Sequence, residues 1–359
     1  NGIHLVLELP TLYACQTAEI FAAGAVEILH QTDLVTHIAF GSEYHNLKHL
    51  NIIAEILAEE PLAYKRLLKS GLNQGLSFPA ARLRAIQQYI RDIYGEDKLP
   101  SQLIERILKG SNSILAIEYL KALMRLKSTI QPVIIPRVGS SYNTEAIEGQ
   151  YSSATAIRKS ILSGEEWACI SHTLPSVSLK ILKDSINRGR GPVSINSFDQ
   201  LLLGMLRQAP FSEIASWMDV EEGLENRIKR FAQKCTSIQD FLLETKTKRY
   251  TYTRLQRILI HGLLGIKTQD VIRFHKNGGP SYIRILGFNT EATPLLSKLK
   301  KTSNLPIITK PAHYYRYGLE NINIMFEYEI LATDLYVLAF PNPDQRKGGQ
   351  ELTQDIVRI

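Results

Sequence analysis

The segment from Tyr151 to Lys159, Tyr-Ser-Ser-Ala-Thr-Ala-Ile-Arg-Lys, holds residues suited to binding phosphate. Ser153 is a good N-cap for a helix over the residues that follow, and the free backbone N–H groups at such a helix end bind phosphate. Thr155 adds a hydroxyl donor and Arg158 a guanidinium for the phosphates of a nucleotide. The alternative is a plain capped surface helix with a solvated Arg-Lys pair, which spacing alone favours because capping serines are common.

Two further positions lie at the ends of predicted elements. Gly41 follows a predicted strand over Thr36–Phe40, where the missing Cβ lets a nucleotide approach the backbone closely; the alternative is a turn glycine. Asn112 comes just before a predicted helix over Ile114–Leu126 and offers an amide donor and acceptor to an adenine or ribose edge. On sequence alone, an ordinary N-cap is the better interpretation of Asn112.

A third position follows another predicted strand, Pro132–Ile135. A guanidinium at that position, from Arg137, can pair with phosphate. The alternative is a surface arginine in a weak ion pair.

The basic stretch from Arg227 to Lys276 indicates a different chemistry. It holds twelve Lys or Arg residues and three acidic ones, a net charge of +9 that exceeds the +7 of the whole chain. Basic residues interleaved with tyrosines suit RNA phosphates and stacking on exposed bases. These candidates are Lys246, Lys248, Arg249, Tyr250, Tyr252, Arg254 and Arg257, with Arg227, Lys229 and Arg230 extending the patch. The alternative is a solvated helix face with the tyrosines in the core, but the local charge exceeds what solubility needs and favours RNA binding.

Other patterns in the sequence give weaker evidence of a functional site. His45 and His49 are four residues apart, yet no third ligand with suitable spacing is evident, so a surface pair is the better interpretation than a metal site. Gly278-Gly279 and Gly287 resemble turn glycines, because no Gly-x-Gly-x-x-Gly pattern surrounds them. No Gly-x-Ser-x-Gly elbow occurs, so hydrolase chemistry has no local support.

The elements that must position these residues alternate at the start of the chain. A strand-like run (Ile3–Leu9), a helical pattern (Thr17–His30) and the strand over Thr36–Phe40 follow the βαβ order of a parallel sheet, whose ligands bind at the carboxyl ends of the strands. Helical periodicity covers Leu47–Leu126, and a linker-like composition between Asn187 and Ser197 predicts a domain boundary.

Beyond that boundary, helices dominate up to about Phe274. The last part mixes strands over Tyr282–Leu286 and Pro306–Thr309 with a long helix over Leu319–Ala339.

Composition bounds the class of protein. The chain has 359 residues, 44% of them hydrophobic and 21% charged, which is enough for two or three globular domains. No run of 18 apolar residues and no signal-peptide pattern occurs, which argues against membrane and secretion roles. Three widely spaced cysteines support neither a disulfide framework nor a thiolate metal site, and a reducing cytoplasm fits best.

The segment at Ser153 resembles the Ile-Ser-Ser-Thr-x-Ile-Arg motif of the nucleotidyltransferase superfamily, enzymes that bind ATP with a His-x-Gly-His loop and form adenylates. It departs from that motif at Ser152 and Ala154. With other segments the resemblance narrows to the tRNA(Met) cytidine acetate ligase family and covers nearly the whole chain. These segments are Asn1–Pro10, Gln16–Glu19, Phe40–Glu43, Leu76–Arg82, Asn112–Tyr119, Ser153–Arg158, Tyr250–Arg257, Arg284–Asn289, Leu305–Lys310 and Ala332–Tyr336.

The resemblance implies an α/β fold with a Rossmann-like nucleotidyltransferase parallel sheet and helical insertions, followed by a mostly helical α+β C-terminal region. The expected domains are an ATP-binding domain over residues 1–190 and a tRNA-binding region over 191–359. It also implies the reaction: ATP, carried as its Mg²⁺ complex, and acetate form acetyl-adenylate, and the acetyl group passes to N4 of the wobble cytidine of elongator tRNA(Met). The implied ATP-site residues are Gly41, Asn112, Arg137, Val138, Ser153, Thr155 and Arg158.

The family's His-x-Gly-His loop would precede Asn1, so we expect an N-terminally truncated chain that is inactive alone, and no catalytic residue is named. Two alternatives stay open at this point. One is a non-catalytic RNA-binding protein on a decayed nucleotidyltransferase fold. The other is an enzyme that adenylates a small metabolite and uses the basic stretch only structurally.

Overall fold

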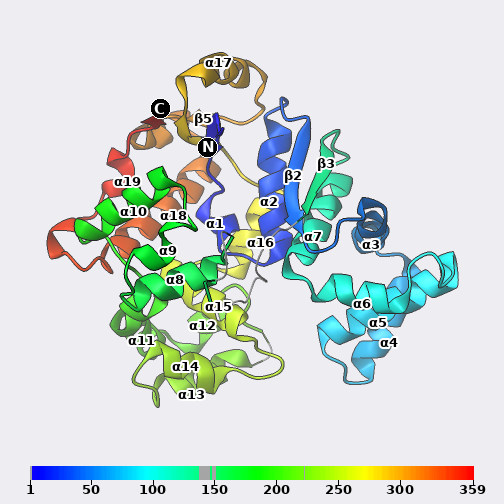
Figure 1. The fold of residues 1–359 in the computed structure, drawn as a ribbon. Helices are drawn as coiled ribbons and strands as arrows, with labels where there is room; N and C mark the ends of the chain where they lie inside the picture. Colours follow the sequence, from blue (N-terminus) through cyan, green and yellow to red (C-terminus); the bar gives the residue numbers. More distant parts are fainter. Residues whose placement is uncertain (1, 137–145, 148–150, 222) are drawn as a thin grey trace. The chain divides into compact units, whose positions relative to one another are not determined.

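The computed structural model describes residues 2–136, 146–147, 151–221 and 223–359. The chain forms two compact units (Figure 1). Unit 1 contains Asn1–Cys15, Gly139–Pro294 and Pro306–Ile359, and unit 2 contains Gln16–Val138 and Leu295–Leu305. The boundary predicted at residue 190 rests on linker composition and on function, and it stays a prediction.

Unit 2 is built on two parallel strands. β2 (His37–Ser42) pairs with β3 (Gln131–Pro136), with Gly41 opposite Ile135. Both strands were predicted, and their parallel pairing agrees with the prediction of a parallel sheet. Buried and exposed residues alternate along β2, so Ile38 and Phe40 join the core while their neighbours face away from it.

Helices supply the rest of the unit 2 core. α2 (Ala18–Gln31), α3 (Leu47–Glu59) and α7 (Ser111–Arg125) pack together, and α7 also packs on β2. The other helices are α4 (Leu62–Asn73), α5 (Phe78–Tyr94), α6 (Ser101–Lys109) and α17 (Thr293–Thr302), which begins in unit 1 and ends in unit 2. The helical periodicity predicted between Leu47 and Leu126 is confirmed.

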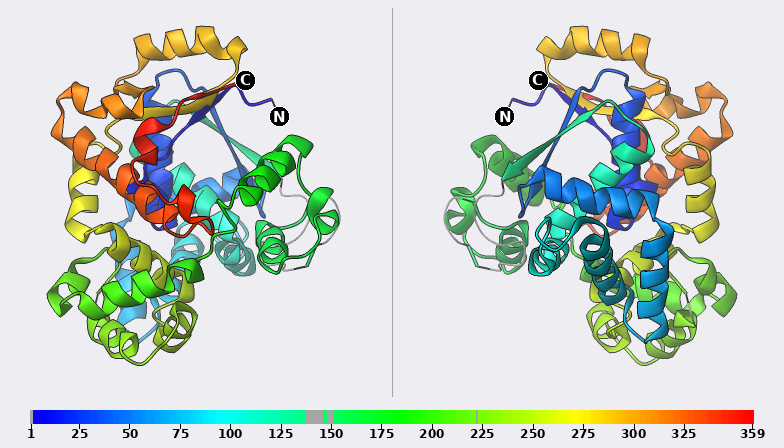
Figure 2. Two further views of the ribbon diagram at one scale, coloured as in Figure 1. Left: turned by 90° about the vertical axis from the view of Figure 1, so that its left-hand side faces the viewer. Right: turned by 90° about the vertical axis from the view of Figure 1, so that its right-hand side faces the viewer.

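Unit 1 contains a mixed sheet. β4 (Ile283–Phe288) pairs antiparallel with β1 (Leu5–Leu7) and parallel with β5 (Ile307–Ile308) and β6 (Val357–Arg358). The first and last strands of the chain therefore both lie on β4 (Figure 2). The prediction that the first strand forms a βαβ unit with Thr36–Phe40 was wrong. A short apolar strand fits many sheet edges, and its partner is chosen by contacts that are distant in sequence.

The helices of unit 1 are α1 (Thr11–Ala14), α8 (Ala154–Leu162), α9 (Ala168–Ser171), α10 (Ser176–Asn187), α11 (Asp199–Gln208), α12 (Phe211–Ser216), α13 (Leu224–Ala232), α14 (Ile238–Thr245), α15 (Tyr252–Leu264), α16 (Thr268–Lys276), α18 (Glu320–Val337) and α19 (Gln350–Thr353). Residues of α11 to α15 and of the turns between them form a second core around Trp217, Phe241 and Leu255. Short 3₁₀ helices cover Ile195–Phe198, Thr290–Ala292, Pro311–Tyr317 and Pro343–Gln345. Gly265 ends α15 at a φ of 66°, the left-handed region that favours glycine.

A buried ion cluster fixes β1 in unit 1. The guanidinium of Arg284, 3% exposed, contacts the carboxylates of Glu8 at 2.7 Å and of Glu351. Glu329 accepts hydrogen bonds from the backbone N–H of Thr11 at 2.7 Å and from its hydroxyl at 2.6 Å. Burial, together with the nearby carboxylate of Glu329, raises the pKa of Glu8 to about 8 even though Arg284 opposes the shift. Glu8 and Glu351 therefore share the guanidinium of Arg284, and the Glu329 carboxylate, held by Thr11, is a third acidic group close by.

Candidate functional site

Gly41 lies near the carboxyl end of β2 and is exposed. A Cβ there would meet only the carbonyl oxygen of Ile135, at 4.0 Å, among the described residues. Its φ is not in the left-handed region. Neither packing nor backbone conformation within the described chain therefore requires a glycine, and its bare backbone leaves room for a ligand.

Glu43 ties the loop after β2 to the first turn of α7. Its carboxylate accepts hydrogen bonds from Asn112 N (3.2 Å), Asn112 Nδ2 (2.8 Å), Ser113 N (2.7 Å) and Ser113 Oγ (2.9 Å). Burial alone would raise the pKa of Glu43, but these hydrogen bonds outweigh it and lower the pKa. Glu43 thus satisfies the helix end that Asn112 was predicted to cap.

Asn112 differs from its prediction in position. It is the second residue of α7 rather than the residue before the helix. Its amide nitrogen donates to Glu43, so its side-chain oxygen is the group that can face a ligand. Because Glu43 is two residues after Gly41, this contact brings the carboxyl end of β2 and the start of α7 together.

The helix predicted after Ser153 is confirmed. Ser153 is the N-cap of α8, 5% exposed, and its hydroxyl accepts from the backbone N–H of Ala156 at 3.0 Å. Thr155 is half-buried in the first turn, and Arg158 is exposed. These three residues lie in unit 1, whereas Gly41 and Asn112 lie in unit 2. Arg137 and Val138 lie outside the described residues, and the role of all seven in ATP binding stays a prediction.

A buried ion-pair network in unit 2 was not predicted. Lys121, 6% exposed, contacts Glu118 at 2.6 Å and Glu19 at 2.8 Å. Arg125 contacts Glu19 at 3.1 Å, and Arg82 lies 3.9 Å from Glu118. The sequence feature that could have predicted this network is the i, i+3 spacing of Glu118 and Lys121 within an otherwise apolar helix. The network joins α2, α5 and α7.

Part of the basic stretch stabilises unit 1 itself. Arg254 donates to the backbone oxygen of Asp219 at 2.7 and 3.1 Å, and Arg257 pairs with its carboxylate at 3.0 Å. Arg227 donates to the last carbonyls of α14, and Lys229 to those at the end of α11, including Arg207 O at 2.7 Å. These four side chains satisfy backbone groups or a carboxylate.

The remaining basic candidates lie at the surface. Lys246, Lys248, Arg249 and Arg230 are exposed, and the first three occupy the segment between α14 and α15. Tyr252 is half-buried, with its hydroxyl donating to Gln239 at 3.0 Å.

Tyr250 requires a correction. It is only 9% exposed and packs in the helical core of unit 1, so its ring has no open face for stacking on a base. Tyr250 therefore fits the alternative interpretation, in which the tyrosine lies in the core.

The comparisons with known proteins agree with this fold. A family model described as "HIGH Nucleotidyl Transferase" matches residues 1–351. The chain is 42% identical over 359 residues to the tRNA(Met) cytidine acetate ligase of Acetivibrio thermocellus, covering 99% of this chain and 85% of that protein. It is 38% identical over 365 residues to the enzyme of the same name from Halothermothrix orenii, covering 100% and 85%.

Two solved structures are also similar. The crystal structure of Thermotoga maritima TmcAL (apo, form I) matches with a TM-score of 0.94 at 32% identity, covering 100% of this chain and 85% of that one. The structure of T. maritima TmcAL bound with alpha-thio ATP matches with a TM-score of 0.91 and the same coverage. The chain therefore belongs to the tRNA(Met) cytidine acetate ligase family of HIGH nucleotidyl transferases, which confirms the predicted fold class and family.

Within the described part of the chain, no helix combines the length and apolar character that crossing a membrane requires.

Proposed function

We propose that this protein is an ATP-dependent ligase that acetylates N4 of the wobble cytidine of elongator tRNA(Met) through an acetyl-adenylate. The observation that carries the proposal is the 42% identity, over 99% of the chain, to a relative named for this reaction. The similar structure with a bound ATP analogue supports ATP as the activating substrate. A tRNA substrate supports a cytoplasmic location for the proposed activity.

Each unit offers groups of a kind that suits a nucleoside triphosphate, and this supports the proposal. Gly41 offers an exposed backbone that packing does not require to be glycine, and Arg158 offers an exposed guanidinium one turn into α8. The first turn of α8 adds backbone N–H groups and the hydroxyl of Thr155. In the proposal these groups, with Ser153, Asn112, Arg137 and Val138, orient ATP and neutralise its phosphates while the acetate carboxylate attacks the α-phosphorus.

Mg²⁺ would enter as part of the ATP complex and lower the charge of the phosphates. Among the described residues, no group of three or more His, Cys, Asp or Glu side chains could hold a metal ion.

The test is the composition of the tRNA after reaction. Elongator tRNA(Met) transcript, ATP, Mg²⁺ and acetate are incubated with the full-length gene product, and the digested nucleosides are analysed by mass spectrometry. We expect N4-acetylcytidine only when all components are present. RNA binding without acetylcytidine would support a non-catalytic RNA-binding protein, and acetylcytidine formed without ATP would contradict adenylate chemistry.

A further inference from the structure

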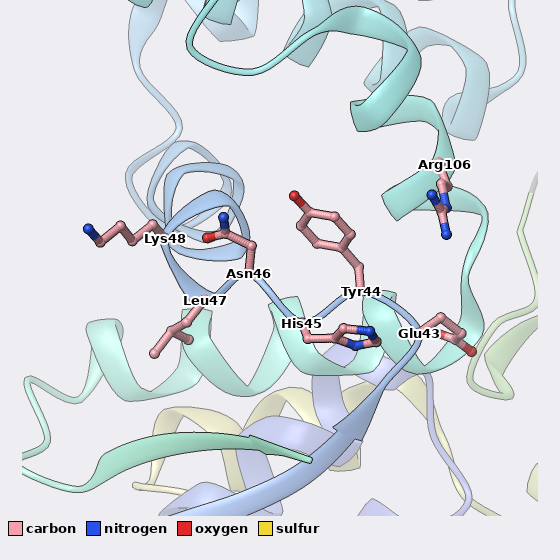
Figure 3. Close-up of a pocket in the computed structure, with 7 residues that line it drawn as sticks. All are labelled: Glu43, Tyr44, His45, Asn46, Leu47, Lys48 and Arg106. Carbon is pink, nitrogen blue, oxygen red and sulfur yellow. The ribbon is translucent and has the colours of Figure 1, made fainter. Parts of the chain in front are cut away.

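An open hollow of about 760 Å³ lies in unit 2 directly after β2 (Figure 3). It is lined by Glu43, Tyr44, His45, Asn46, Leu47, Lys48 and Arg106. All but Arg106 belong to the loop between β2 and α3 or to the first turn of α3, and Arg106 comes from α6. The hollow therefore begins two residues after Gly41, at the carboxyl end of β2.

The floor of the hollow is held in place. The ring of Tyr44 stacks on the imidazole of His49 at 5.9 Å between centroids and 12° between planes, and its hydroxyl contacts His49 Nδ1. Its backbone N–H donates to Ser42 Oγ at 3.1 Å, and Asn46 caps α3 by accepting from the backbone N–H of His49 at 3.3 Å. Because the Tyr44 ring at the floor is already fixed, little side-chain entropy is lost when a ligand binds against it.

Two cationic side chains of the hollow are open to solvent. Lys48 and Arg106 are exposed and form no hydrogen bond or ion pair in the part of the chain that the structure describes. The nearest carboxylate in the lining, Glu43, accepts four hydrogen bonds from the start of α7. In the view of Figure 3, the Tyr44 ring stands between Lys48 on one side and Arg106 on the other.

We propose that this hollow binds single-stranded nucleotides of the tRNA substrate, with Lys48 and Arg106 pairing with phosphates and Tyr44 and His45 contacting a base. Cations on both sides of a fixed aromatic ring suit a strand whose phosphates alternate with bases. Acetate, with four heavy atoms, would leave most of 760 Å³ unfilled. The inference rests on the proposed function, and it adds an RNA contact in unit 2 to the basic segment of unit 1.

The test compares two double variants of the full chain. Lys48→Gln/Arg106→Gln removes two charges at the hollow. Lys65→Gln/Arg91→Gln removes two exposed charges elsewhere in unit 2, where each is paired with a surface glutamate. We expect the KM for tRNA to rise at least tenfold in the first variant and less than twofold in the second. Acetate-dependent exchange of pyrophosphate into ATP, which needs no tRNA, should stay within twofold of wild type.

Filter binding at several salt concentrations gives a second readout. Loss of two phosphate contacts to a single strand should flatten the log–log salt slope by about 1.4. His45→Ala should weaken tRNA binding with little change in slope, because base contacts release few counterions. All of these side chains are exposed, and thermal melting checks that the variants fold.

Three outcomes would overturn the inference: an unchanged tRNA KM in the hollow variant, an equal effect in the control variant, or a rise confined to the KM for ATP. The proposed function fails separately, if the wild-type chain forms no acetylcytidine. Retained acetylation with unchanged tRNA affinity in the hollow variant would contradict the inference alone.

Discussion

At the scale of single residues, Arg158 is the clearest candidate for a phosphate contact, because it is exposed and follows a capped helix start. Arg158→Ala should weaken ATP binding by about 1.5–3 kcal/mol, the range for hydrogen bonds to charged groups. Calorimetric titration with ATP measures the change. Lys180→Ala, an exposed charge on α10, is the control and should leave the affinity unaltered. An Arg158 variant that binds ATP like wild type would remove this residue from the site.

Glu8 gives a prediction for the effect of pH on stability. Its pKa is raised from an ordinary value of 4.5 to about 8, so the folded chain binds this proton more tightly than the unfolded chain. The free energy of unfolding should therefore fall as pH rises from 4.5 to 8. Glu8→Gln keeps a polar group near Arg284 but does not ionise, so it should lose less stability over that interval. Urea unfolding at pH 5, 7 and 8.5 tests this, and parallel pH profiles for both proteins would contradict it.

Among the elements, α15 depends on a close approach at Gly262. A Cβ there would lie 2.7 Å from the ring of Trp217, which is 1% exposed. Gly262→Ala should destabilise unit 1 by about 1–3 kcal/mol, the cost of overpacking, despite the better helix propensity of alanine.

Gly204 in α11 is the matched control. It is exposed, and a Cβ there meets nothing within 4 Å. Gly204→Ala should stabilise the protein by about 0.5–1 kcal/mol. Denaturant unfolding measures the free energy of unfolding of both variants. A stabilising Gly262→Ala would contradict the prediction and show that Trp217 can move aside.

Elements with a local signal could be predicted from the sequence. The pattern over Thr17–His30 corresponds to α2, and Ser153 caps α8 as expected, because periodicity and capping are set by neighbouring residues. The partner of β1, by contrast, is a strand almost 280 residues away. The burial of Tyr250 and the pairing of Arg254 and Arg257 with Asp219 depend on how the helices pack, which the local pattern does not contain.

At the scale of the whole molecule, the basic residues between Arg227 and Lys276, whose stretch carries a net charge of +9, are of two kinds. Some bind backbone groups or a carboxylate within unit 1, and others, such as Lys246, Lys248 and Arg249, lie exposed at the surface. Replacing Lys246, Lys248 and Arg249 by Gln should flatten the salt dependence of tRNA binding by about 2–3 in log–log slope and leave stability unchanged. The matched control replaces Lys298, Lys300 and Lys301, three exposed lysines of α17. Equal slopes for the two triple variants would mean that the surface group is only a solvated face.

Arg257→Gln should change stability rather than the salt dependence of tRNA binding, because it breaks the ion pair with Asp219. Asp219 has a φ of 71°, which is unusual for a residue other than glycine. We expect a loss of about 1–3 kcal/mol in the free energy of unfolding, as for a partly buried group left unpaired. The number of phosphate contacts should change little. A large change in salt slope with unchanged stability would place Arg257 in the RNA interface instead.

The most direct measurement locates the acetyl group on the RNA. The full-length gene product, ATP, Mg²⁺ and ¹⁴C-labelled acetate are incubated with elongator tRNA(Met) or with a transcript that differs only by uridine at the wobble position, and nuclease fragments are mapped. We predict label in the anticodon fragment of the first tRNA and none in the second. Equal labelling of both tRNAs, or label that stays in a small metabolite, would contradict the proposed function.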